Sequence, residues 1–175
     1  IQQRNAERVA IIGGNLVTTL LYAQMLTDCY GKGIHISAIM DRNSLGSLTE
    51  REITAVFLPV IKKTCFVDLS QPLHAYESVV SQMNDPRPMD AVINLEDIPG
   101  SETVATLLVK ECGMVFYTSL KNNYNMGLLV ADSLGKEVTS YALDGYVKEA
   151  HTFAAELIEK VSSNLEFLDA IYSRK

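Results

Sequence analysis

The chain has 175 residues, a length typical of one domain, and 47% of them are hydrophobic, enough to bury a core. Its net charge of −6 argues against nucleic acid or an anionic membrane as a partner of the whole surface. The sequence shows no apolar run of transmembrane length and no secretory signal. Cys29, Cys65 and Cys112 are odd in number and widely spaced, which favours a reduced, cytoplasmic protein over a disulfide framework.

The first expected element is an apolar strand, Val9 to Ile12, followed by Gly13 and Gly14. A helix comes next and closes near residues 31–33, because its apolar residues recur at helical spacing up to that point. A strand, a glycine turn and a helix in this order are typical of the start of a dinucleotide-binding unit. The usual spacing, G-x-G-x-x-G, is not kept.

The next strands are expected at Ile34 to Met40 and at Cys65 to Val67. The segment "TERE" between them predicts a helix that begins with a capping box, in which Thr49 caps the helix and Glu52 reaches back to it. A further helix is expected to start near Pro72, since proline is favoured in the first helical turn.

In the second half of the chain, strands are expected at residues 91–93, 114–117 and 138–143. Helices are expected over residues 101–112 and about 124–131. The last part of the chain is also helical by pattern, with Ser163 and Glu166 as a second capping box that restarts the helix.

Near-continuous apolar strands that alternate with helices predict an α/β fold with a parallel sheet covered on both faces. Six strands match a doubly wound, Rossmann-like sheet in the order 3-2-1-4-5-6. A flavodoxin-like order with five strands is the alternative. We expect one domain over residues 1–175, and we expect it to belong to a longer chain because the sequence starts at Ile1 rather than Met.

In such a fold the pyrophosphate of a cofactor binds the amide groups at the start of the first helix. Gly13 allows the tight turn, and Gly14 and Asn15 tolerate unusual backbone geometry. The Leu16 side chain does not allow a phosphate to approach the backbone as closely as glycine does. We therefore take Gly13, Gly14, Asn15 and Leu16 as candidate cofactor contacts, and a plain strand-to-helix turn as the alternative.

Polar residues follow two other strands at the edge where open α/β sheets bind ligands. Asp41 can accept hydrogen bonds from both ribose hydroxyls of NAD, whereas Arg42 favours the extra phosphate of NADP. Asn94, Glu96 and Asp97 follow the fourth strand, and the two carboxylates can hold a cation or divide acid and base roles. The alternative for both groups is a solvated loop.

Other catalytic or metal-binding motifs are lacking. His35, His74 and His151 do not have ligand spacing, and the sequence contains no C-x-x-C, H-E-x-x-H, G-x-S-x-G or phosphate-loop motif. The sequence thus predicts no catalytic residue and no metal site.

Two segments resemble the C-terminal part of the L-erythro-3,5-diaminohexanoate dehydrogenase family, "MDAVINLEDIPGSETVATLLVKECGMVFYTSLKNN" and "ADSLGKEVTSYALDGYVKEAH". The resemblance runs from about Val9 to the end and is firmest from Met89 to Tyr172. It implies an NAD(P)-dependent oxidative deamination of a diamino acid in lysine fermentation, and kinship with medium-chain alcohol dehydrogenases. It also implies a GroES-like catalytic domain before a Rossmann domain, of which only the second is represented here.

The resemblance maps cofactor positions onto Gly13, Asp41 and Asn94, and it carries over no catalytic residue. The glycine turn of that family is G-x-x-G-x-x-G. Gly13 keeps its first glycine, whereas Leu16 and Thr19 replace the later two.

Two functions follow from the sequence. The first is the NAD(P)-binding domain of an oxidoreductase. The second is a non-catalytic sensor or regulatory domain, for example attached to a transcriptional regulator, in which Glu96 or Asp97 meets the ammonium group of an amino-acid metabolite. Either way we expect a small-molecule partner, no membrane and no direct nucleic-acid contact, and we leave a homodimer open.

Overall fold

The computed structural model of the chain describes residues 6–31, 33–83, 85, 87–119, 121–142 and 150–173. These residues form a sheet of six strands, all paired in parallel, in the order β3-β2-β1-β4-β5-β6. The predicted doubly wound, Rossmann-like α/β fold is confirmed, and the five-stranded alternative is wrong. The strands are β1 (Arg8–Ile12), β2 (His35–Asp41), β3 (Lys63–Val67), β4 (Met89–Asn94), β5 (Val109–Tyr117) and β6 (Val138–Ala142).

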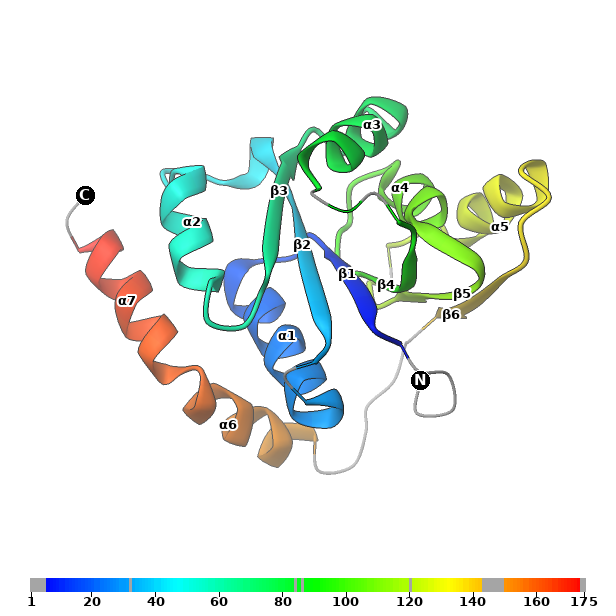
Figure 1. The fold of residues 1–175 in the computed structure, drawn as a ribbon. Coiled ribbons are helices and arrows are strands. Elements are labelled where there is room, and N and C mark those ends of the chain that lie inside the picture. The colour runs from blue at the N-terminus through cyan, green and yellow to red at the C-terminus, as the bar shows by residue number, and fades with distance from the viewer. Residues whose placement is uncertain are drawn as a thin grey trace.

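Helices cover both faces of the sheet (Figure 1). The helices are α1 (Leu16–Tyr30), α2 (Glu50–Phe57), α3 (Pro72–Gln82), α4 (Ser101–Leu108), α5 (Tyr124–Ser133), α6 (Ala150–Lys160) and α7 (Ser162–Tyr172), with a short 3-10 turn over Arg42–Ser44. Helices α1, α2, α6 and α7 lie on one side, and α3, α4 and α5 lie on the other. Among the described residues, no helix is long and apolar enough to cross a membrane.

The two faces of the sheet carry separate hydrophobic cores. Val9 and Ile11 of β1 pack with α1, α2 and α7, whereas Ala10 and Ile12 pack with α3 and α4. Because neighbouring residues of one strand are buried on opposite faces, the strands have continuous apolar sequences. This is the physical basis of the pattern from which the fold was predicted.

Local capping fixes where two helices on the α1 side begin. Asn15 caps α1 and accepts a hydrogen bond from the Thr18 amide at 2.8 Å. The predicted capping box of α2 is confirmed, since Thr49 accepts from the Glu52 amide and the Glu52 carboxylate accepts from the Thr49 amide.

Two expected boundaries are wrong. The helix predicted over residues 101–112 ends at Leu108, and β5 begins at Val109, which is buried and pairs with Met89. Tertiary pairing thus overrides the helical pattern after Leu108. Ser163 does not cap the last helix, because α7 already begins at Ser162. The sixth strand ends at Ala142, and residue 143, its expected end, lies outside the described residues.

Candidate functional site

A cavity of about 450 Å³ opens at the carboxyl edge of the sheet, between the turn after β1 and the end of β2. Its polar lining comes from Gly14, Asn15, Thr18, Asp41, Ser44 and Glu96. The structure thus brings together several residues that the sequence singled out, from three separate segments. This edge is where open α/β sheets bind ligands.

The glycine turn has the backbone geometry that its sequence requires. Gly13 has φ +62° and Gly14 has φ +80°, a left-handed region that side chains disfavour. Gly13 is buried and donates its amide hydrogen to the Ile39 carbonyl at 2.7 Å, which ties the turn to β2. Thr19 is also buried, and its hydroxyl lies 2.8 Å from the Gly13 carbonyl oxygen. Thr19 therefore stabilises the turn through the Gly13 carbonyl, and it does not line the cavity.

The Glu96 side chain reaches into this turn. Its Oε1 atom accepts a hydrogen bond from the Gly14 amide at 3.0 Å, and a Cβ atom at Gly13 would overlap the Glu96 side chain. The loop after β4 holds Glu96 in place at two points. The Glu96 amide donates to Asn94 Oδ1 at 3.1 Å, and the Glu96 carbonyl accepts from Asn122 Nδ2 at 2.6 Å. The Glu96 carboxylate thus accepts a hydrogen bond from the Gly14 amide, a backbone donor at the position that binds a cofactor phosphate in this fold.

Burial makes the charged form of this carboxyl group costly. Desolvation raises the pKa of Glu96 above its ordinary value, and the negative charges of Asp41 and Asp97 act in the same direction. Hydrogen bonds from the Gly14 and Asp97 amides oppose this shift without cancelling it. A second anion placed at the turn would therefore be repelled by the carboxylates of Glu96 and Asp41.

Asp41 lies at the end of β2, as expected, and lines the cavity. It exposes 3% of its surface, and its two carboxylate oxygens accept hydrogen bonds from the Leu69 amide at 3.1 Å and the Ser44 hydroxyl at 2.8 Å. These bonds fix the carboxylate in one orientation. Each oxygen keeps a lone pair that could accept a further hydrogen bond from a ligand hydroxyl.

Four candidate residues lie outside the cavity lining: Gly13, Arg42, Asn94 and Asp97. The Arg42 guanidinium pairs with Glu50 at 2.8 Å and donates to the Phe66 carbonyl at 2.9 Å. Asn94 is fully buried and donates to the Ser101 hydroxyl at 3.0 Å, so its role here is to shape the loop after β4.

Asp97 is exposed and does not share a site with its neighbour Glu96. It accepts a hydrogen bond from the Ser119 hydroxyl and pairs with Lys121 at 3.2 Å. The Ser119 hydrogen bond, together with Lys121, lowers the pKa of Asp97. The two adjacent carboxyl groups thus have pKa values shifted in opposite directions, and only Glu96 faces the cavity.

Apart from Leu16, which the sequence singled out, sequence reasoning missed the apolar lining. It consists of Leu16, Val17, Met40, Leu45, Leu48, Ile53 and Leu168. Leu45 and Leu48 lie in the segment between β2 and α2, after the 3-10 turn, and their position after a strand end could have indicated them. Leu168 comes from α7, which packs against α2 and is joined to it by a hydrogen bond from Asn164 to the Val56 carbonyl at 2.7 Å. Nothing local in the sequence predicts that contact.

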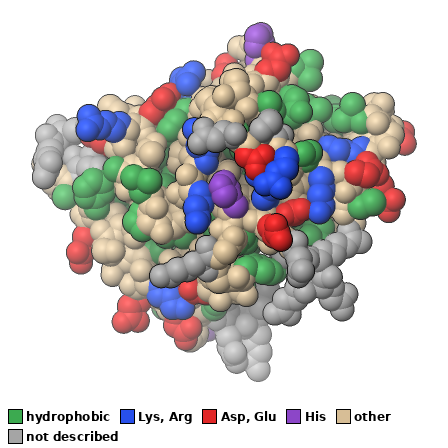
Figure 2. Space-filling model, viewed as in Figure 1, with side chains coloured by type: hydrophobic (Ala, Val, Ile, Leu, Met, Phe, Trp, Pro, Cys, Tyr) green, Lys and Arg blue, Asp and Glu red, His purple; other side chains and the backbone are tan. Residues whose placement is uncertain are grey.

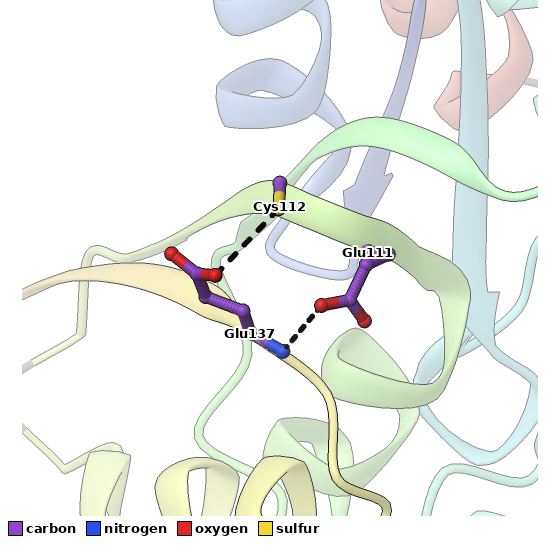
Figure 3. Close-up of side chains that lie close together, drawn as sticks. All are labelled: Glu111, Cys112 and Glu137. Carbon is purple, nitrogen blue, oxygen red and sulfur yellow. Dashed lines mark hydrogen bonds between the residues drawn. The ribbon is translucent and has the colours of Figure 1, made fainter.

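A separate cluster lies at the opposite, amino edge of the sheet, where β5 and β6 begin (Figure 3). It contains Glu111, Cys112 and Glu137, whose potential metal-ligand atoms lie within 4.8 Å of one another. All three residues are exposed. Glu137 forms hydrogen bonds with the other two: its amide donates to the Glu111 carboxylate at 2.9 Å, and the Cys112 thiol lies 3.8 Å from its carboxylate. These contacts explain the cluster without a metal.

Comparison with known proteins finds a relative in sequence. No protein-family model matches the chain. The chain is 26% identical over 166 residues to L-erythro-3,5-diaminohexanoate dehydrogenase of Fusobacterium nucleatum. The match covers 95% of this chain and 46% of the relative, so the chain spans about half the length of that enzyme. This match supports the resemblance seen in the sequence. At 26% identity, membership of the family is a proposal.

Solved structures of other dehydrogenases share the fold. Glucose dehydrogenase from Haloferax mediterranei, in complex with NADP, Zn and gluconolactone, superposes with a TM-score of 0.62 at 13% identity, over 94% of this chain and 44% of that one. D-arabinose dehydrogenase from Sulfolobus solfataricus gives 0.56 at 14% identity, over 93% of this chain and 45% of that one. The chain has a Rossmann-like fold. At these identities the likeness establishes the fold alone.

Proposed function

We propose that this chain is the NAD(P)-binding domain of an oxidoreductase-like protein, and that the adenosine part of the dinucleotide occupies the cavity beside α1. The observation that carries the proposal is the cavity itself. It lies between the β1–α1 turn and Asp41 at the end of β2, where this fold binds dinucleotides. Its volume of about 450 Å³ lies within the range of small-molecule pockets.

The nucleoside end of the ligand fits the residues present. Leu45, Leu48 and Leu168 offer an apolar surface for the adenine ring, and Asp41 can accept hydrogen bonds from the ribose hydroxyls. The Asp41 charge favours NAD over NADP, because it repels a phosphate on the ribose. Arg42, which could have reversed that preference, is directed toward Glu50 and Phe66.

The pyrophosphate end does not fit the turn as it stands. The Glu96 carboxylate already holds the Gly14 amide, so a phosphate must displace a group of its own charge. We therefore assign the dinucleotide to this cleft through its nucleoside half, and we derive no chemical step from it. Hydride transfer is what a nicotinamide cofactor supplies when bound, and the residues that direct it belong to a catalytic domain.

The wider role of the protein is part of the same proposal. Joined to a GroES-like catalytic domain in a longer chain, this domain would serve a dehydrogenase of amino-acid metabolism, as in lysine fermentation. The odd number and wide spacing of Cys29, Cys65 and Cys112 suit the reducing cytoplasm.

A second candidate is favoured by one specific observation, the presence of two carboxylates, Glu96 and Asp41, in the cavity lining. Two carboxylates suit the ammonium groups of an amino-acid metabolite better than they suit a pyrophosphate. In that case the domain is a non-catalytic sensor that kept the sheet and uses Glu96 for its ligand.

Calorimetric titration of the chain with four ligands separates the two functions. The ligands are adenosine, NADH, NADPH and 3,5-diaminohexanoate. The first function predicts binding of adenosine and NADH, with NADPH weaker than NADH. The second predicts binding of the diamino acid alone, weakened by Glu96→Gln and unchanged in the control Asp97→Asn. No binding of adenosine or NADH at millimolar concentration would reject the first function.

A further inference from the structure

A second, smaller cavity, of about 80 Å³, lies at the amino edge of the sheet, opposite the first. Arg8 at the start of β1, His35 at the start of β2, and Lys62 and Lys63 at the start of β3 line it, with Asp85 beside them. On the face shown in Figure 2, Lys and Arg side chains gather around a histidine, with acidic side chains among them. The proposed function uses none of these residues.

Positive charge dominates this cavity although the chain as a whole is acidic. Asp85 is the one carboxylate of the lining, and its charge is shared by ion pairs with Arg8 and with Arg87, the latter at 2.6 Å. Within the part of the chain that the structure describes, Lys62 and Lys63 form no ion pair. The site therefore repels cations and attracts a small anion.

Two buried nitrogen atoms at this cavity have no hydrogen-bond partner among the described residues, Arg8 Nε and His35 Nδ1. Arg8 exposes 9% of its surface and is held in place, because its Nη2 atom donates to the carbonyls of Asp85 at 2.9 Å and Arg87 at 3.1 Å. A buried donor without an acceptor is unfavourable, and buried polar groups in folded proteins are rarely left unpaired. Two nitrogen atoms without a partner among the described residues thus belong to residues that line the cavity, where positive charge is concentrated.

We propose that this cavity is a binding site for a small oxyanion, a phosphate or carboxylate group, which accepts hydrogen bonds from Arg8 Nε and His35 Nδ1 and is neutralised by Lys62 and Lys63. Its size suits one such group and excludes a nucleotide, and it shares no lining residue with the cavity at the carboxyl edge. An oxyanion supplies hydrogen-bond acceptors for these donors, and its negative charge balances the positive charges of the two lysines.

His35 reports on occupancy of the site. Burial, together with the positive charges of Arg8 and Lys62, lowers the pKa of His35, and Asp85 opposes this shift. Lys63, a further charged group, lines the same cavity. An anion bound beside the ring stabilises its protonated form, so binding raises the pKa of His35.

The test is an NMR titration of the histidine ring resonances of the chain with sodium phosphate, against sodium chloride at equal ionic strength. We expect saturable shifts of the His35 ring and a higher His35 pKa in phosphate. His74, which is exposed on α3, is the internal control. Sodium sulfate and sodium acetate in parallel show whether a tetrahedral oxyanion or a carboxylate is preferred, and saturation by either supports the site.

Charge variants exclude general electrostatic effects. Lys62→Gln should weaken phosphate binding several-fold, whereas Arg51→Gln, an equal loss of charge at an exposed position on α2, should leave it unchanged. Both positions are exposed, so both variants should fold. Equal weakening by the two variants would overturn the proposal. Equal responses of His35 and His74, or the same shifts in chloride, would also overturn it, because they would indicate a general effect of salt without an oxyanion site.

Discussion

Replacing Glu96 by alanine removes the carboxylate that holds the Gly14 amide, and it frees this donor for a phosphate. We expect NADH to bind the Glu96→Ala chain more tightly than the parent. The reason is that NADH, when it binds the parent chain, must displace the Glu96 side chain from the turn and bring its own negative phosphate close to that carboxylate. Adenosine has no phosphate, so its affinity should be the same in both chains.

The size of the effect follows from the charges. Two unit charges about 4 Å apart repel each other by about 1 kcal/mol in water and about 4 kcal/mol at an effective dielectric constant of 20. Glu96 is half-buried and the cavity opens to solvent, so a value between these limits applies. A gain of about 1–3 kcal/mol corresponds to binding that is tighter by a factor of about 5–150. Glu96→Gln should give a smaller gain, because its amide oxygen still accepts from Gly14.

Isothermal titration with NADH and with adenosine measures both affinities in each chain. Asp97→Asn is the matched control, because Asp97 is the neighbouring carboxylate and lies outside the cavity lining. If Glu96→Ala binds NADH no more tightly than the parent while adenosine still binds, Glu96 is not the obstacle and this reasoning is wrong. If neither ligand binds either chain, the proposed nucleotide function itself fails.

Three further predictions concern Asp41, Glu96 and Thr49. Asp41→Asn should weaken adenosine binding about tenfold, as expected for a charged hydrogen-bond acceptor, and should reduce the preference for NADH over NADPH; unchanged calorimetric affinities would contradict the ribose role. Because burial raises the folded-state pKa of Glu96, the stability linked to its protonated form is present below its unfolded-state pKa and is lost as the pH rises through the raised value. Glu96→Gln should therefore melt at a higher temperature than the parent at neutral pH and at a similar one in acid, whereas an equal difference at both pH values would argue against this origin. Thr49→Ala removes the cap of α2 and should cost about 1 kcal/mol, a fall in melting temperature of roughly 2–4 °C by circular dichroism; no fall would show that the capping box contributes nothing.

The sequence predicted the sheet because its strands are buried on both faces and its first turn contains Gly13 and Gly14. It failed where long-range pairing competes with local pattern. Residues after Leu108 keep a helical spacing of apolar side chains, yet Val109 pairs with Met89 of β4 and starts a strand.

For the candidate site, sequence position was informative but side-chain direction was not. Asp41 and Glu96 were singled out because they follow strands, and both line the cavity. That Glu96 occupies the glycine turn depends on the loop that Asn94 and Asn122 hold in place. Leu168 reaches the cavity only because α7 packs on α2, which no local pattern predicts.

The central claim, that the cavity at the carboxyl edge takes the nucleoside half of a nicotinamide dinucleotide, is tested most directly by mapping amide chemical shifts during titration of the chain with adenosine. The account predicts saturable shifts at Gly14, Asp41, Leu48 and Leu168, which come from four segments and meet at this cavity. An absence of shifts at saturating ligand, or shifts confined to the amino edge around His35, would contradict it.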